Sequence, residues 1–567
     1  MRPLFSLFVL GSVLVGCGTD GGGGSTTGGN SGSGGSNLNP NGGANPAGGA
    51  NASGGANSAG GNTPAGGTAT GGGNNPGGGN NPGGGNNPGG GNNPGGGNGN
   101  GGAGGTGTAG SANGGAGGVP NGAPKGVNVT SKDLPVPSGV VFNVADDYFN
   151  DGFIPATPVA NFGTQSQITT VVNDDGSLDI AWLDYTNGKG KPWAVNSPSP
   201  IYITHVDAAL TTATTTNSGV NTYKLLGFAK DNDGAFYLAY NKDHPFKSAT
   251  AGNQNNLNGN ELHVTKLSGG SPAWDQLIFG NQDNGLEDTL GDPGGAASGV
   301  LGYDPTNQKV IIYVGHSMMW GGVRHQAGFL RLLNPSTGAI IPPSGNDIIH
   351  FGAGWWYSHN FNQRLIIDGG NYYVLAHGDA YSRQLGFGRW SVSGYTTKNN
   401  TDFNESYFAI AGNEGDNNTN AQTGQFVKLK DGRFLMTHTS SQGRSARDVR
   451  LALASGSNGK ADGAGTWLTT NTGTNQATMP KVELLGDYVL VTYALWDSSK
   501  KHQLTWYGAV LSNTLATVVA PQVLPNVEFV DAAPLFRFKG GPNAGQVGWV
   551  SGNASHTLSV RVASLSY

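Results

Sequence analysis

The residues from Ile168 to Leu183 read ITTVVNDDGSLDIAWL, and this stretch decides the fold that we expect. The apolar run Ile168 to Val172 is followed by the turn Asp174-Asp175-Gly176 and by a second run, Leu178 to Leu183. Two such runs joined by an Asp-Gly turn are typical of a β-hairpin. A third run, Ile201 to Val206, follows after a loop, so the unit is strand, tight turn, strand, loop, strand.

The same order of strands and turns recurs along the chain. Six further copies turn at Asp233-Gly234, Pro305-Thr306-Asn307, Asp368-Gly369, Asp431-Gly432, Gly486-Asp487 and Gly540 to Gly545. The distance between successive turns leaves room for four strands and one or two loops in each copy. Helical periodicity is nearly absent, so the repeat predicts an all-β domain.

Seven such units favour a β-propeller of seven four-stranded blades. A single four-stranded sheet cannot bury both of its faces, whereas a ring of sheets packs face to face and shields most edges. The order of strands and Asp-Gly turns resembles NHL-type and related propeller repeats. The last copy ends before a fourth strand, and we expect Val140 to Val144 to supply it. A pair of long β-sandwiches, or a ring of six or eight blades, remains an alternative.

The N-terminus has the pattern of an export signal. Arg2 is followed by an apolar run from Leu4 to Val15, which predicts a signal peptide over residues 1–16. The next residues, Leu14-Val15-Gly16-Cys17, resemble the lipobox of bacterial lipoproteins. This resemblance implies that Cys17, the only cysteine of the chain, is acylated and holds the protein on a lipid bilayer. Gly18 favours the outer membrane, and both its periplasmic and its cell-surface side remain open.

The residues that follow are expected to form a tether. From 17 to 125 the composition is almost entirely Gly, Asn, Ser, Thr, Ala and Pro, with four copies of Asn-Asn-Pro-Gly-Gly-Gly beginning at Asn74, Asn80, Asn86 and Asn92. Such a segment has too little apolar surface to offset the entropy lost on ordering. We therefore expect a disordered linker over 17–125 and the β-propeller over 126–567.

Charge excludes one class of partner. The formal net charge is −5, and no cluster of Lys and Arg with interleaved aromatic residues is evident in the sequence. Nucleic acid is therefore not expected as a ligand. After the signal peptide, no apolar run approaches the length that a membrane-spanning helix needs.

Three histidines occupy equivalent positions in successive repeats. His316, His377 and His438 each follow the second strand of a copy. Their equal spacing suggests a metal site, but equivalent positions on neighbouring blades lie about 10 Å apart, too far for one zinc ion. Equivalent packing is the alternative, and the metal role stays open.

One acidic loop offers a possible calcium site. Asp283, Glu287, Asp288 and Asp292 supply the oxygen ligands that Ca²⁺ takes. A solvated acidic loop is the alternative interpretation, and no other cofactor is expected.

The fourth repeat has the densest set of reactive side chains. It reads WWYSHN over residues 355–360 before its first strand and HGDAYSR over 377–383 after its second. A hairpin returns the chain beside its start, so His359 and His377 should be neighbours. The predicted ligand-binding residues come from the third to the fifth repeat and are His316, Trp320, Arg324, His325, Trp356, Asp379 and His438. Hydrogen bonding between loops is the structural alternative.

The pair His359-Asn360 and His377-Gly378 resembles a motif of ulvan-lyase-like polysaccharide lyases of the BNR-repeat type. The match covers about 25 residues of one blade. It implies that His359 or His377 acts as base, Tyr381 as acid and Arg383 as the group that holds a uronate carboxylate. β-Elimination needs such a base, an acid for the leaving oxygen and a positive group that stabilises the developing charge.

These observations predict a tethered propeller that binds an extracytoplasmic ligand, with a glycan or another envelope polymer as the first expectation. Aromatic, His and Arg side chains suit sugar rings and their carboxylates. Two alternatives stay open, a polysaccharide lyase or hydrolase that uses His359 and His377, and a passive scaffold for envelope proteins. Whether the protein is an enzyme is not decided by the sequence.

Overall fold

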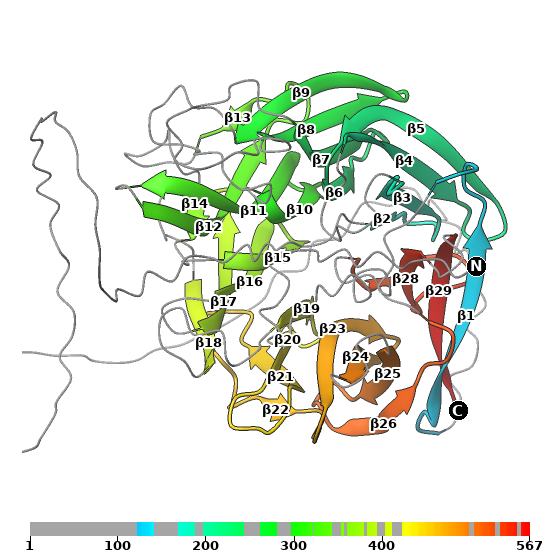
Figure 1. Ribbon diagram of the computed structural model, residues 1–567, viewed down its shortest axis with the longest axis vertical. Helices are drawn as coiled ribbons and strands as arrows, with labels where there is room; N and C mark the ends of the chain where they lie inside the picture. The colour runs from blue at the N-terminus through cyan, green and yellow to red at the C-terminus, as the bar shows by residue number, and fades with distance from the viewer. Residues whose placement is uncertain are drawn as a thin grey trace, which may run out of the picture. The chain divides into compact units, whose positions relative to one another are not determined.

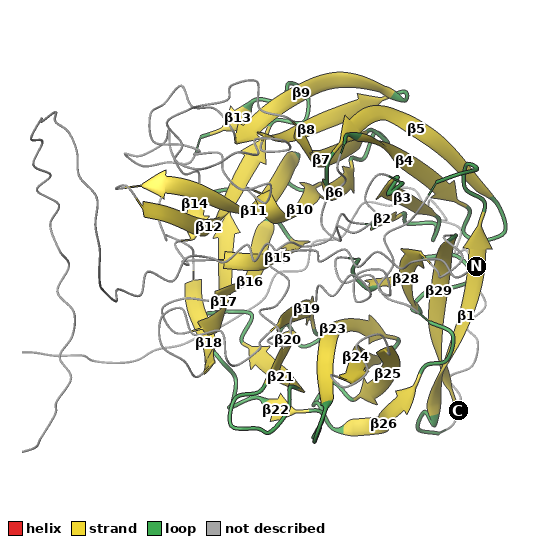
Figure 2. Ribbon diagram, in the orientation of Figure 1, coloured by secondary structure: helices red, strands yellow, loops and turns green. Residues whose placement is uncertain are grey.

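Seven antiparallel sheets, each with four strands paired in succession and one with a short extra strand, stand around a common axis in the computed structural model, which is the ring of a β-propeller (Figure 1). The structure describes residues 122–140, 168–186, 197–242, 261–279, 296–320, 323–342, 353–355, 360–378, 383–393, 403–410, 422–497, 504–527, 533–552 and 557–567. All of the described regular structure is strand, with no helix and hence none long enough to cross a membrane (Figure 2). The predicted all-β class and the number of seven blades are confirmed.

Each blade begins with an inner strand at the axis and ends with an outer strand at the rim. Blade one contains β2 (Thr169–Val172), β3 (Leu178–Leu183), β4 (Ser199–Val206) and β5 (Ala213–Thr222), and blade two contains β6 (Leu225–Lys230), β7 (Phe236–Lys242), β8 (Glu261–Ser268) and β9 (Ser271–Phe279). Blade three contains β10 (Ala296–Asp304), β11 (Lys309–Trp320), β12 (Val323–Leu333) and β13 (Ile340–Ile341), and blade four contains β15 (Asn360–Asp368), β16 (Asn371–Gly378), β17 (Arg383–Ser391) and β18 (Phe403–Ile410). A short extra strand, β14 (Ala353–Trp355), pairs with β12.

The other three blades follow the same order. They contain β19 (Gln422–Lys428), β20 (Phe434–Ser440), β21 (Asp448–Ala454) and β22 (Thr466–Trp467); β23 (Asn475–Leu485), β24 (Tyr488–Asp497), β25 (Leu504–Leu511) and β26 (Thr517–Val523); and β27 (Phe536–Arg537), β28 (Val547–Gly552), β29 (Leu558–Ser566) and β1 (Gly126–Leu134). All seven predicted tight turns lie between the first two strands of a blade.

The ring is closed by the first strand of the domain. β1 pairs along its whole length with β29, from Gly126 opposite Ser566 to Leu134 opposite Leu558. The prediction that Val140 to Val144 supplies this strand is therefore wrong, since Val140 is not in a strand and 141–144 lie outside the described residues. The reason is that β1 is an outer strand with one exposed face, so most of its residues are polar and its apolar signal is weak.

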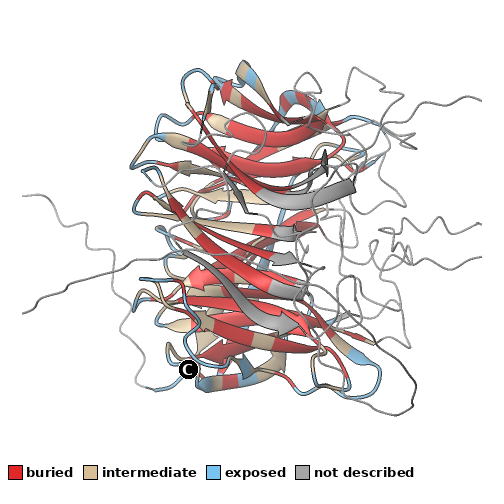
Figure 3. Ribbon diagram, turned by 90° about the vertical axis from the view of Figure 1, so that its left-hand side faces the viewer, coloured by how far each residue is buried: buried red, intermediate tan, exposed pale blue. Residues whose placement is uncertain are grey.

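The core is divided among the contact surfaces between neighbouring blades, which we call seams. Each of the seven apolar clusters of described residues joins two adjacent blades, including the last and the first. In β11, Ile312 packs towards blade two and Tyr313 towards blade four. Because both faces of such a strand are covered, the strands read as continuous apolar runs, and the buried residues follow them (Figure 3).

One end of the ring carries the tight turns, and we call it the turn end. There the Lys230 amine lies 2.7 Å from the Asp179 carboxylate of the preceding blade, and Lys428 pairs in the same way with Asp368. The turns of blades one and seven approach so closely that a Cβ on Gly176 would lie 2.2 Å from the Gly540 carbonyl oxygen. Neighbouring blades are thus fastened to each other at this end.

Candidate functional site

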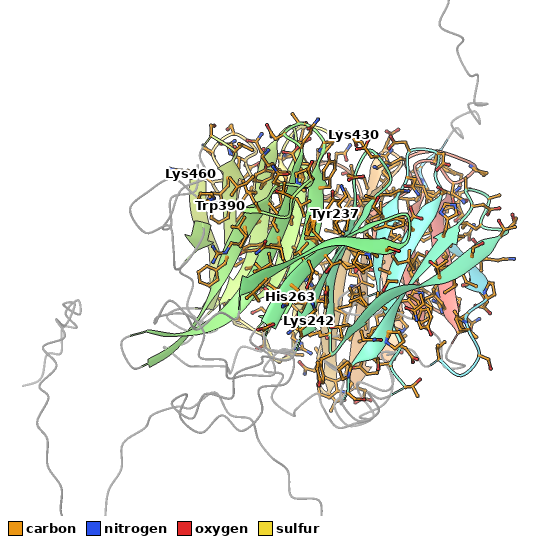
Figure 4. The ribbon with its side chains drawn as sticks, turned by 90° about the horizontal axis from the view of Figure 1, so that it is seen from above. Tyr237, Lys242, His263, Trp390, Lys430 and Lys460 are labelled. Atoms are coloured by element: carbon orange, nitrogen blue, oxygen red, sulfur yellow. The ribbon has the colours of Figure 1, made fainter. Side chains whose placement is uncertain are left out.

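The opposite end of the ring, which we call the loop end, is where inner strands begin and second strands finish. Lys430, next to a tight turn, and Lys242 and His263, at the loop end of blade two, lie towards opposite ends of the ring (Figure 4). The longest connections between strands, including 243–260 and 280–295, start and finish at the loop end. The predicted site residues whose backbone the structure describes lie towards this end: His316, Trp320, Arg324, His325, His377, Arg383 and His438.

In blade four the structure gives the backbone of the predicted histidine motif. In the hairpin of β15 and β16, Asn360 is paired with Gly378 and Phe361 with His377. The backbone of Asn360 and that of Gly378 are thus adjacent, while the predicted contact between His359 and His377 stays a prediction. Arg383 begins β17, and its backbone pairs with that of Ile410. His359, Trp356, Asp379 and Tyr381 lie outside the described residues.

In blade three the predicted residues lie on one long hairpin. The backbone of Trp320 pairs with that of Val323, and Arg324 and His325 follow in the same register, while His316 lies further along β11. The edge of β12 is also paired with β14, which places Trp355 opposite Gly328. The strand β14, which precedes β15 of blade four in the sequence, is therefore paired with blade three. The described predicted residues of blades three and four thus lie in neighbouring parts of the ring.

In blade five a line of polar residues crosses the whole sheet. His438 in β20 is paired with Thr423 in β19 and with Arg450 in β21, and Arg450 is paired with Trp467 in β22. We call these four residues the polar row. Because Met436 and Ala452, two positions along the same strands, pack against blade four, the row lies on the face of blade five that is turned to blade four. The His438 side chain is buried, with 1% of its surface exposed.

At the rim end of the polar row, two guanidinium groups gather around one indole ring. The Arg444 Cζ atom lies 4.4 Å from the Trp467 ring centre, and the Arg450 Cζ atom lies 5.0 Å from it. The Arg444 Nε atom is 2.7 Å from Asp448 Oδ2. Burial, and then the positive charge of Arg444, lower the pKa of Arg450. The two cations thus lie close enough to repel each other.

Sequence reasoning missed this group, although a signal was present. Arg444, Arg447 and Arg450 lie at intervals of three in the segment RSARDVR. Their aromatic neighbour, Trp467, is distant along the chain, and only the pairing of β21 with β22 brings it to Arg450. A search for cationic residues with aromatic residues between them therefore could not detect the group.

At the axis end of the polar row, a hydroxyl group is buried without a partner. Thr423 is 1% exposed, and its Oγ1 atom makes no hydrogen bond to any residue of the described chain. A buried polar group without a partner costs about 1–3 kcal/mol. Within the described chain, the row therefore contains a buried hydroxyl whose desolvation no hydrogen bond offsets.

Blade two has a second polar cluster, in which the described charges compensate each other. Lys242 pairs with Asp275, while the two ring nitrogens of His263 lie 3.1 Å from Asp275 Oδ2 and 2.9 Å from Glu261 Oε2. Burial opposes ionisation of Asp275, but hydrogen bonds from His263, Lys242 and Thr265 outweigh it and lower the pKa of this carboxyl. Among the described residues, Asp448 is the carboxylate that faces the arginines near Trp467, whereas Lys242 and His263 are accompanied by both Asp275 and Glu261.

The proposed metal sites have few described side chains. Of His316, His377 and His438, only His438 has a side chain that the structure describes, and the acidic loop with Asp283, Glu287, Asp288 and Asp292 lies outside the described residues. In the part of the chain that is described, no three His, Cys, Asp or Glu side chains are grouped as metal ligands.

No protein-family model matches the sequence, and no curated protein does either. Among solved structures, an α-L-arabinofuranosidase from Fusarium graminearum is 12% identical, with a TM-score of 0.33 over 60% of this chain and 92% of its own. An endo-arabinase from Bacteroides thetaiotaomicron is 13% identical, with a TM-score of 0.28 over 55% and 98%. A sialidase from Trypanosoma rangeli is 10% identical, with a TM-score of 0.34 over 60% and 54%. Sequence identities and TM-scores this low say nothing about the activity or the ligand of this chain.

Proposed function

We propose that this protein is an exported lipoprotein whose β-propeller binds a glycan or another envelope polymer at the loop end of blades three to five. Acylated Cys17 anchors it to the outer membrane, and residues 17–125 tether the propeller to that anchor. The observation that carries the binding function is the polar row. It places His438, Arg450 and Trp467 on the face of blade five that is turned to blade four, the blade of the predicted histidine motif.

The chemistry of these residues suits a carbohydrate polymer. Indole rings contribute large, rigid surfaces for sugar rings, and guanidinium groups form paired hydrogen bonds with carboxylates. The predicted residues of blades three and four add further aromatic, imidazole and guanidinium groups at the same end. A binding surface spread over three blades suits a chain-like ligand better than a small molecule.

The test uses the full chain with Cys17→Ser, which removes the lipid, and a panel of neutral and acidic polysaccharides in affinity electrophoresis. We expect retardation by at least one polysaccharide. Arg383→Ala at the loop end should weaken binding by about tenfold, in the range of an interface arginine. Arg433→Ala is the matched control, because Arg433 lies at the turn end of blade five and pairs with Asp431 and Asp462.

Failure of the parent protein to bind any polysaccharide, together with capture of an envelope protein that glycans do not displace, would favour the scaffold function instead. Equal losses in Arg383→Ala and Arg433→Ala would remove the assignment to the loop end.

The register of blade four supports a second function, a polysaccharide lyase. Asn360 opposite Gly378 and Phe361 opposite His377 bring the two halves of the lyase-like motif together. In such a reaction His359 or His377 takes the proton beside a uronate carboxylate, the bond to the leaving oxygen breaks as a C=C bond forms, and Tyr381 protonates that oxygen. Arg383 would hold the carboxylate.

Elimination leaves an unsaturated uronate that absorbs in the ultraviolet, so absorbance during incubation with acidic polysaccharides tests this function directly. His377→Ala should abolish the rise in absorbance and leave binding in place. Binding without any rise would exclude the lyase and leave the binding function intact.

A further inference from the structure

We propose that Arg444 and Arg450, gathered around Trp467, form a subsite for the acidic group of a polysaccharide, either a carboxylate or a sulfate ester. This inference rests on the proposed glycan-binding function and names the class of glycan. The subsite lies at the rim end of the polar row, where the connection 441–447 reaches the loop end of blade five.

Arg444 is held in place but keeps donors for a ligand. Its Nη2 atom donates to the Thr469 carbonyl oxygen at 3.0 Å and to Thr470 Oγ1 at 3.4 Å, and its Nε atom faces Asp448. Within the described chain, its Nη1 atom has no protein partner. About a fifth of the Arg444 side chain is exposed, 21%, so part of this side chain is open to the solvent.

The carboxylate beside the two arginines is already engaged. Asp448 Oδ1 accepts hydrogen bonds from Thr469 Oγ1 and from the Asn471 backbone nitrogen, each at 2.7 Å, and Oδ2 faces Arg444. Asp448 is 1% exposed, so it serves as an internal support for the loop. The guanidinium of Arg450 meets neutral acceptors, the Ala464 carbonyl oxygen at 2.7 Å and Gln442 Oε1 at 3.4 Å.

The electrostatics favour an anionic ligand over a neutral one. Asp448 faces Arg444, and the positive charge of Arg444, after burial, lowers the pKa of Arg450, so the two guanidinium groups are close enough to act on one ligand. A bound carboxylate or sulfate relieves this repulsion and matches the planar donors of a guanidinium group. The chain as a whole carries a net charge of −5, so attraction of a polyanion must come from a local group such as this one.

The ring of Trp467 supports the assignment to a polymer. Both guanidinium groups lie within the distance of a cation–π interaction, which orients them without neutralising their charge. The indole is half-buried, and it lies at the outer edge of the blade, where a long ligand can pass.

The experiment compares two pairs of polysaccharides that differ only in charge, polygalacturonate with its methyl ester and dextran sulfate with dextran. Binding of the full chain with Cys17→Ser is measured by calorimetry at low and high salt. The variants are Arg444→Gln, which removes the charge, and Arg444→Lys, which keeps the charge but loses the planar donors. Arg433→Gln at the turn end is the control.

We expect the parent to prefer one acidic polymer over its neutral counterpart by at least about tenfold, with binding weakened by salt. Arg444→Gln should erase this preference, and Arg444→Lys should retain part of it. Arg433→Gln should behave as the parent, and unchanged melting temperatures show that the variants are folded.

Other outcomes overturn the inference in distinguishable ways. If the parent binds an acidic polymer and Arg444→Gln binds it equally well, the subsite is wrong and the proposed function stands. If Arg444→Gln weakens the binding of neutral and acidic polysaccharides equally, Arg444 supports the loop and does not select ligands by their charge. If the parent binds no polysaccharide, or binds single-stranded DNA through Arg444 instead, the proposed function fails together with the subsite.

Discussion

Between blades four and five, the part of the seam near the turn end is packed with aromatic rings, whereas the part near the loop end carries the polar row. In the first part, the Phe434 ring lies 4.4 Å from that of Tyr373 and 5.3 Å from that of Phe387. In the second part, Thr423 has a buried hydroxyl without a partner in the described chain, and Arg450 is a half-buried cation.

This difference separates what holds the blades together from what the blades present to a ligand. The transfer of apolar rings from water into the seam stabilises the folded state. Buried hydroxyl and guanidinium groups lose their hydrogen bonds to water, and hydrogen bonds to protein groups offset this cost only in part. The polar part of the seam should therefore tolerate substitution in folding but not in binding, and the aromatic part should do the opposite.

The largest expected effect is in the aromatic part. Phe434→Ala leaves a cavity among Tyr373, Phe387 and Phe426 and should cost about 3–5 kcal/mol of unfolding free energy. Denaturant unfolding measures this loss, and the affinity of the fraction that remains folded should not change. A loss below about 1 kcal/mol would mean that the rings do not hold this seam.

A second effect concerns Glu483, a polar exception near the turn end of blade six. Burial raises its pKa to about 7 from 4.5, against a hydrogen bond from the Leu484 nitrogen and the charge of Arg537. The folded state therefore binds the proton more tightly than the unfolded state, so the contribution of Glu483 to stability is greatest below pH 4.5 and falls as the pH rises towards 7.

The fall in stability should reach at most about 3 kcal/mol, and Glu483→Gln should remove it. Unfolding free energies of both proteins between pH 4 and about 8 give the two curves. Parallel curves would show that Glu483 is not desolvated in the folded state. The turn end would then contain no carboxyl with a pKa raised by burial at this position.

A smaller effect tests the polar row itself. Thr423→Val removes a hydroxyl without a partner and keeps the shape, so stability should stay the same or rise by about 1 kcal/mol. Thr437→Val is the matched control in the next strand, because Thr437 Oγ1 donates to the Gln425 carbonyl oxygen at 2.9 Å. The control should lose about 1 kcal/mol. If both variants lose stability equally, the row is a structural network and the comparison fails.

The smallest effect is expected from the ion pair that joins the same two blades at the turn end. Both Lys428 and Asp368 are more than one third exposed, so water screens their attraction. Lys428→Gln should cost less than about 1 kcal/mol. The difference from the parent should shrink further in high salt, and thermal melting at two salt concentrations checks both points.

The fold could be predicted because its signal is local. An Asp-Gly turn between two apolar runs, such as Asp431-Gly432, specifies a hairpin without reference to the rest of the chain. The closing strand could not be predicted in the same way, since β1 gains its place from contacts with residues far away in the sequence, above all its pairing with β29. An outer strand with polar residues on its open side looks like linker in the sequence.

The candidate site shows the same division. The backbone pairing of Asn360 with Gly378 belongs to one hairpin, which the sequence predicts, while His359 lies outside the described residues. The gathering of Arg444 and Arg450 around Trp467 depends on the pairing of β21 with a two-residue outer strand, β22, which has no periodic pattern of its own. Sequence spacing alone therefore could not reveal which aromatic ring accompanies the arginines.

The closure of the ring by β1 also sets the order in which the domain can fold. Ser559 in β29 donates a hydrogen bond to Asp133, a residue 426 positions earlier, and such distant contacts form slowly. Until β29 exists, the chain can build only an open arc with an unpaired edge at each end, and such edges are sites for pairing with other chains. β1 cannot pair until β29 has been synthesised, and a growing chain stays vulnerable to aggregation until the two strands pair.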